Sequence, residues 1–371
     1  MRLSKSVLGE EEVLAVKKVI LEDGYLGMGS EVQKFESDIA DYLEIKSKNV
    51  TCVSSGTAAL HLALEAVLKP GDEVLVPSLT YLSSFQSISA AGCIPVSCEV
   101  YEDTLTIDIE DANNKITKNT RAIMPVHYAS NLVDLEKIFD LTKSNNLRII
   151  EDAAHAFGCE YKGKKIGSFG DIVCFSFDGI KNITSGEGGA IISFDSKVNS
   201  IVKDSRLLSI ENDTEKRFTG NRSWEFDVIR QGYRYHMSNI FAAIGREQLK
   251  KLESDFAPKR IILFDNYVKN LQDIPQIKLQ KINSFSKIIP HIFPLRVINN
   301  RDGLKTYLEK NDIPTGIHYK PNHLLKFYRK NKVKLKVTEM IYDQTLTLPL
   351  HPELTINDVK KITQLIKKYF K

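Results

Sequence analysis

Lys181 and Asp152 are the residues of this 371-residue chain whose types and positions first point to chemistry. Asp152 ends the strand-like run 147–152, and a carboxylate at the end of a buried strand is costly without a partner. Lys181 follows 29 positions later (181 − 152). A lysine amine can bond to an aldehyde, and a carboxylate can keep a pyridine nitrogen protonated. The pair suits pyridoxal phosphate.

Two further segments carry residues suited to the rest of this coenzyme. The stretch 54–57 reads Ser-Ser-Gly-Thr and precedes a predicted helix, whose free N–H groups could bind a phosphate. Tyr81 follows a predicted strand and could stack on a ring. Each feature alone has an ordinary explanation: a helix cap, a packed tyrosine, a structural carboxylate or a solvated lysine. Only their joint occurrence favours the coenzyme.

Short apolar strands alternate with helical patterns over about the first half of the chain. We predict helices over 58–67, 83–91 and 132–144, and strands over 50–54, 73–77, 94–100, 122–126, 148–152, 172–177 and 190–193. This alternation predicts an α/β fold whose mostly parallel central sheet is flanked by helices. Ligands of such sheets bind beyond the carboxyl ends of the strands, where the residues above lie.

The pattern changes after residue 240. We expect one strand over 288–297 and helices over 240–252, 259–271, 302–310 and 356–369. This composition predicts a smaller C-terminal α+β domain of residues 246–371, packed on a large domain of residues 1–245.

The bulk composition is that of an ordinary globular protein, with 42% hydrophobic and 26% charged residues. A net charge of +4 gives no reason to expect nucleic acid or a membrane surface as partner. The five cysteines form no CxxC pair, so neither a metal site nor a disulfide framework is expected. The N-terminus lacks the apolar core of a signal peptide, and we predict a cytoplasmic location.

Several motifs resemble those of the DegT/DnrJ/EryC1/StrS family of sugar-nucleotide aminotransferases, which have the fold-type I aminotransferase architecture. The motifs follow the family order along nearly the whole chain: Ser55-Gly56-Thr57-Ala58-Ala59-Leu60, Gly71-Asp72-Glu73-Val74, Glu151-Asp152-Ala153-Ala154-His155, Ser176-Phe177 with Lys181, Gly186-Glu187-Gly188-Gly189, Gly232-Tyr233-Arg234-Tyr235-His236-Met237-Ser238 and Leu348-Pro349-Leu350-His351-Pro352.

The resemblance implies a role for each matching residue. Lys181 would form the Schiff base with pyridoxal phosphate and shuttle the proton. Asp152 would bind the pyridine nitrogen and Tyr81 would stack on the ring. His155 would lie near the ring hydroxyl, with an ordinary core histidine as the alternative. The phosphate would be held by Gly56, Thr57 and Ser176.

The chain departs from the family pattern at two places. Arg234 and His236 stand where the family commonly has Asn and a basic residue. Family members are homodimers with shared active sites, so we expect a homodimer in which Arg234 reaches the phosphate of the neighbouring subunit. The family's Tyr-Gly stretch is also replaced, by Val126-His127-Tyr128-Ala129-Ser130-Asn131.

The implied reaction moves an amino group from L-glutamate, which leaves as 2-oxoglutarate, to a nucleotide-linked keto sugar through pyridoxamine phosphate. We favour dTDP-4-keto-6-deoxyglucose, which would give a 4-amino-4,6-dideoxy sugar for O-antigen or lipopolysaccharide synthesis. A 3-keto sugar is the alternative. Gly29, His318 and Tyr319 are the predicted sugar or nucleotide contacts, although ordinary packing between domains explains the last two equally well.

Two other classes of function fit less well. A nicotinamide-dependent oxidoreductase would need GxGxxG after the first strand, where this chain has Ser54-Ser55-Gly56-Thr57-Ala58-Ala59. A non-catalytic regulator on the aminotransferase fold predicts loss of the lysine or the carboxylate, and the chain has both Lys181 and Asp152.

Overall fold

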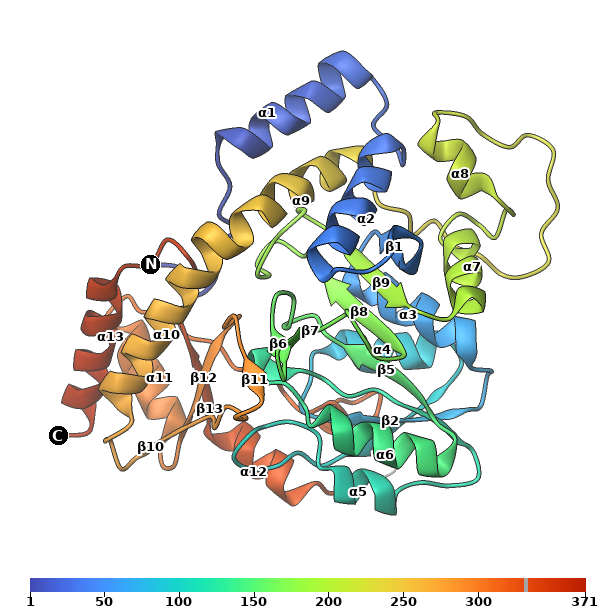
Figure 1. The fold of residues 1–371 in the computed structure, drawn as a ribbon. Helices are drawn as coiled ribbons and strands as arrows, with labels where there is room; N and C mark the ends of the chain where they lie inside the picture. The colour runs from blue at the N-terminus through green and yellow to red at the C-terminus, as the bar shows by residue number, and fades with distance from the viewer. Residues whose placement is uncertain (330–332) are drawn as a thin grey trace.

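A seven-stranded sheet forms the centre of the protein in a computed structural model that describes residues 1–329 and 333–371 (Figure 1). Its strand order is β1-β9-β8-β5-β4-β2-β3. β9 runs antiparallel to both neighbours, and the other neighbouring pairs are parallel. The strands are β1 (Val50–Val53), β2 (Glu73–Pro77), β3 (Ile94–Cys98), β4 (Thr120–Ile123), β5 (Arg148–Asp152), β8 (Ile172–Ser176) and β9 (Gly189–Ser193). The predicted α/β class is confirmed.

Alternate residues of the strands enter two different cores, because successive side chains of a strand point to opposite faces. In β8, Val173 and Phe175 join one core, and Ile172 and Cys174 join the other. The first core is covered by α2 (Ser30–Leu43), α5 (Ile109–Asn114), α6 (Leu135–Asn145) and α9 (Asn239–Lys251). The second is covered by α3 (Gly56–Val67), α4 (Leu82–Ala90) and α7 (Ser196–Ser205).

The predicted helices agree with the structure apart from their ends. The helix predicted from residue 132 begins at Leu135 because the carboxylate of Asp134 caps it, accepting from the Lys137 N–H. The strand predicted over 288–297 is shorter, since β12 starts at Phe293. Several elements were not predicted, α2, α5 and α7 above among them. Others are α1 (Glu10–Lys18), η1 (Val19–Asp23), η2 (Ser47–Asn49), η3 (Tyr128–Ser130), β6 (Glu160–Tyr161), β7 (Lys164–Lys165), α8 (Asp213–Phe218) and β11 (Ser286–Lys287).

The C-terminal region builds a core of its own around a three-stranded antiparallel sheet. Its elements are η4 (Leu252–Phe256), α10 (Ala257–Leu271), β10 (Ile277–Leu279), β12 (Phe293–Val297), α11 (Arg301–Glu309), β13 (Thr345–Leu348) and α13 (Ile356–Tyr369). α9, η4 and α10 follow one another without a break and connect the two regions (Figure 1). The boundary after residue 245 falls inside α9 and stays a prediction.

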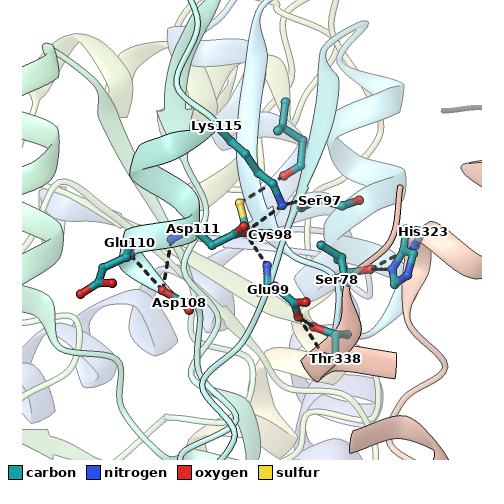
Figure 2. A network of polar contacts seen from close by, with 12 residues as sticks. Ser78, Ser97, Cys98, Glu99, Asp108, Glu110, Asp111, Lys115, His323 and Thr338 are labelled. Atoms are coloured by element: carbon teal, nitrogen blue, oxygen red, sulfur yellow. Dashed lines mark hydrogen bonds and ion pairs between the residues drawn. The ribbon is translucent and has the colours of Figure 1, made fainter. Parts of the chain in front are cut away.

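One C-terminal segment returns to the large sheet and contains η5 (Asn322–Leu324) and α12 (Lys336–Gln344). The Glu99 carboxylate, just after β3, accepts from the Thr338 N–H (2.9 Å) and hydroxyl (2.6 Å) at the start of α12. Ser78, just after β2, bonds to the His323 ring (2.7 Å). Figure 2 shows both anchors. They hold this segment over the carboxyl ends of the strands.

The carboxyl ends of β1, β2, β5 and β8 meet at one edge of the sheet, because these strands point in the same direction. The four segments predicted to bind the coenzyme follow these strands directly. Within residues 1–329 and 333–371, no helix has the length and apolar character that a bilayer crossing requires.

Candidate active site

A cavity of about 350 Å³ lies at this edge of the sheet. It takes residues from all four strand ends and from the C-terminal segment that returns to the sheet. Nine of the predicted site residues line it: Gly56, Thr57, Tyr81, Asp152, His155, Ser176, Lys181, His318 and Tyr319. The structure therefore brings together residues up to 263 positions apart in sequence (319 − 56).

Asp152 is the buried acid of the cavity, with only 4% of its surface exposed. Ser84 donates a hydrogen bond to its Oδ2 (2.7 Å), and the Ala154 N–H donates to its Oδ1 (3.2 Å). Both donors are neutral, and in the described part of the chain Asp152 forms no ion pair within 4.0 Å. A buried carboxylate that has only neutral hydrogen-bond donors favours a cationic partner, and a protonated pyridine nitrogen provides one.

Lys181 is the amine of the cavity, held by a turn in which its N–H donates to the Asp178 carbonyl (3.1 Å). Removal from water lowers the pKa of the Lys181 ammonium to about 8, since burial disfavours the charged form. The carboxylates of Asp178 and Asp152 act in the opposite direction. A substantial fraction of neutral amine, the nucleophilic form, is therefore present near physiological pH.

The start of α3 offers a phosphate site. Ser55 caps this helix, and its hydroxyl accepts from the Ala58 N–H (3.1 Å). The N–H groups of Gly56 and Thr57, in the first turn, have no carbonyl within the helix to bind. A Cβ at Gly56 would lie 2.7 Å from the Ser176 Cβ, so glycine allows the start of α3 to lie directly against the end of β8. Ser176 thereby faces the helix N-terminus, as an anion site requires.

One wall of the cavity is aromatic. The Tyr81 and Tyr319 rings lie 5.4 Å apart, and the Tyr319 hydroxyl is 3.3 Å from the His155 Nε2. Burial and the nearby Lys181 lower the pKa of His155 well below its ordinary value and that of His318 to about 4. Both imidazoles are therefore neutral at physiological pH. A flat, uncharged wall of this kind suits a ring coenzyme.

Several cavity residues escaped the sequence analysis. Ser84, which bonds to Asp152 behind the lining, was also missed, and its place three residues after Tyr81 on a predicted helix could have indicated that it faces the same way. The lining residues that give no comparable signal in the sequence are Thr80, Ser83, Tyr128, Asp178 and Glu187.

Two predicted site residues lie outside the cavity of their own chain. Gly29 is buried, where a Cβ would meet Asn239 and Tyr25. Arg234 is exposed to solvent in the single chain. The structure therefore does not bring either residue to Lys181 within one subunit, and both roles stay predictions.

The residues present fit pyridoxal phosphate. The acid without a cationic partner, the desolvated lysine and the open helix N-terminus occupy one cavity, as the ring nitrogen, aldehyde and phosphate of that coenzyme require. Asp152, Lys181, Gly56, Thr57 and Ser176 would hold these groups.

Comparison with known proteins agrees with this arrangement. The model of the DegT/DnrJ/EryC1/StrS aminotransferase family matches residues 7–367. GDP-perosamine synthase of Vibrio cholerae is 36% identical over 352 residues, covering 92% of this chain and 91% of that protein. The aminotransferase TlmJ of Streptoalloteichus hindustanus superimposes with a TM-score of 0.92 at 27% identity, covering 99% of this chain and 98% of the other. The putative sugar aminotransferase Spr1654 of Streptococcus pneumoniae, in its PLP form, superimposes with a TM-score of 0.90 at 27% identity, covering 100% of this chain and 98% of the other.

Proposed function

Because the chain belongs to the DegT/DnrJ/EryC1/StrS aminotransferase family, and so is a pyridoxal-phosphate-dependent sugar aminotransferase, we propose that it aminates a nucleotide-linked 4-keto-6-deoxyhexose. L-Glutamate is the proposed amino donor. The observation that carries the proposal is the presence of Lys181 and Asp152 in one cavity, with the open N-terminus of α3 beside them.

Each residue has a defined task in this reaction. When bound, the coenzyme supplies an electron sink for the carbanion that forms as the substrate loses its proton. Lys181 holds the coenzyme and then carries that proton, which its lowered pKa allows at physiological pH. Asp152 keeps the ring nitrogen protonated. Gly56, Thr57 and Ser176 would bind the phosphate at the start of α3.

The favoured substrate is dTDP-4-keto-6-deoxyglucose, which would yield a 4-amino-4,6-dideoxy sugar for a surface glycan. The Vibrio cholerae relative is a GDP-perosamine synthase, so a GDP-linked sugar is the second candidate for the nucleotide. A 3-keto sugar is the alternative for the carbon that receives the amine. His318 and Tyr319 line the cavity and are the proposed sugar contacts, with Gly29 as a further candidate.

The absorbance of the purified protein tests the reaction type. Protein supplied with pyridoxal phosphate should show a yellow band that bleaches on addition of L-glutamate, and borohydride should attach the coenzyme covalently. Lys181→Ala should lose the covalent attachment, while Lys162→Ala, at an exposed lysine, should keep it. Retention of the attachment in Lys181→Ala would disprove the assignment of the lysine.

A panel of keto sugars tests the substrate. The panel consists of dTDP- and GDP-linked 3- and 4-keto sugars. The glutamate-treated protein should regain its yellow band only with the sugar that it accepts as substrate. NMR of the product then identifies the aminated carbon. Recovery with a 3-keto sugar alone would overturn the proposed position of amination.

A further inference from the structure

The turn after β4 contains two consecutive non-glycine residues in the left-handed conformation. Ala129 has a φ of 55° and Ser130 a φ of 70°. Side chains other than glycine adopt this conformation at a cost in free energy, so such a pair persists only where surrounding contacts hold it. The turn lies in the stretch 126–131, where the sequence departs from the family pattern, and the proposed function gives it no role.

The hydroxyl of Ser130 joins this turn to two histidines. It donates to the His155 carbonyl (2.6 Å) and accepts from the His291 N–H (3.0 Å). Ser130 is fully buried, and the rings of His155 and His291 pack with centroids 4.4 Å apart. One side chain therefore fixes the backbone on both sides of the packed imidazoles.

The left-handed turn also directs a backbone N–H at the His155 ring. The Ala129 N–H donates to the His155 Nδ1 (3.3 Å), so that nitrogen carries no proton. Burial and Lys181 lower the pKa of His155 well below its ordinary value, so the ring is neutral and its one proton lies on Nε2. Nε2 faces the Tyr319 hydroxyl in the cavity wall. The opposite tautomer would place two N–H groups against each other.

We propose that Ser130 is a positioning residue for His155: it stabilises the left-handed turn that fixes the imidazole as the Nε2–H tautomer, directed into the cavity. The value of this donor for coenzyme binding rests on the proposed function. The tautomer itself is a property of the protein without coenzyme.

The tautomer can be measured on the protein free of coenzyme. NMR of protein carrying isotope-labelled histidine distinguishes a protonated from an unprotonated ring nitrogen, and the chain has only eight histidines. His155→Gln identifies the His155 signals. We expect a single Nε2–H form in the wild type, and a mixture of tautomers in Ser130→Gly and Ser130→Ala.

Ser130→Gly separates positioning from general stability. Glycine adopts the left-handed conformation without strain but lacks the hydroxyl that anchors the turn to the His155 carbonyl, so this variant should fold and still lose the single tautomer. Ser209→Gly is the matched control, because Ser209 is also buried, has a φ of 57° and donates to a main-chain carbonyl (Gln231, 2.9 Å). It should leave the His155 signals unchanged.

A coenzyme titration supplies the second readout. Ser130→Gly should bind pyridoxal phosphate about five- to tenfold more weakly, the equilibrium effect of one hydrogen bond. An unchanged single tautomer in Ser130→Gly would overturn the positioning role. The wild-type protein could instead show the single Nε2–H form and yet bind no coenzyme. That result would overturn the proposed function, while the role of Ser130 in setting the tautomer would still be supported.

Discussion

Burial decides the charge of the ionisable residues around the cavity. His155 and His318 are neutral because desolvation and the adjacent Lys181 ammonium both disfavour a second cation. The same desolvation lowers the pKa of Lys181 to about 8, while Asp152 and Asp178 limit the shift. The site therefore contains one titratable amine and neutral rings, which is the combination that an amine nucleophile needs.

The reactivity of Lys181 should follow this lowered pKa. Only the neutral amine attacks a carbonyl, so its modification should rise with pH and reach half its maximum near pH 8. Reductive methylation of the coenzyme-free protein, read by peptide mass spectrometry, measures the profile. Lys162 is the internal control, because the Glu136 carboxylate raises its pKa and its modification needs a higher pH. Identical profiles for the two lysines would contradict the effect of burial.

Ser84 should contribute to coenzyme binding through Asp152. Ser84→Ala removes the hydrogen bond that fixes the orientation of the Asp152 carboxylate, so the coenzyme affinity should fall about tenfold. Equilibrium binding of pyridoxal phosphate measures the change. Gln86→Ala, at an exposed position of the same helix, should leave the affinity unchanged. Equal affinities for both variants would show that Ser84 is dispensable.

The residues that the sequence identified and those it missed differ in one physical respect. Asp152 was predictable because a carboxylate at the end of a buried strand is costly and so signals a function. Lys181 followed from its joint occurrence with Asp152 and from the family motif. Ser84 and Ser130 carry no such cost in the sequence, since a serine is common on helices and turns. Their roles depend on three-dimensional contacts with Asp152 and His155, which only the structure shows.

Among the elements, local pattern predicted those whose partners are close in sequence. The seven strands follow from apolar runs, and α13 spans residues 356–369 as predicted from its amphipathic period. α12 has no comparable signal, because its position depends on Glu99, 239 residues earlier (338 − 99). Antiparallel β9 was also not distinguishable from its parallel neighbours, since all of them are buried on both faces.

The start of α12 should be a sensitive point of the fold. Glu99→Gln removes the negative charge that accepts from the Val337 and Thr338 N–H groups, so we expect a loss of about 1–2 kcal/mol in the free energy of unfolding. Urea unfolding measures the loss. Glu110→Gln, at an exposed position in the first turn of α5 (Figure 2), should change stability by less than about 0.5 kcal/mol. Equal effects of the two substitutions on the free energy of unfolding would contradict the role of Glu99 as an anchor of α12.

At the scale of the whole molecule, the single chain leaves a conspicuous apolar segment in solvent. Trp224, Phe226 and Ile229 are 83%, 55% and 70% exposed, and Arg234 follows them closely in sequence. Exposed aromatic and aliphatic side chains gathered in one segment are typical of a surface that another chain covers. This agrees with the predicted homodimer, in which Arg234 would serve the cavity of its partner.

Mixed dimers decide whether Arg234 acts across the subunits. Lys181→Ala and Arg234→Ala should each inactivate the protein as homodimers. In a mixed dimer of the two, one cavity would keep Lys181 and also receive the intact Arg234 of the partner subunit, so about half of the wild-type activity should return. If Arg234 served its own chain, both cavities would be defective and no activity would return.

Arg222→Ala, at another exposed arginine of the same segment, is the control partner. Paired with Lys181→Ala it should give half activity under either arrangement. Purification through a different tag on each chain isolates the mixed dimers, which makes a failure of the Arg234 pairing decisive.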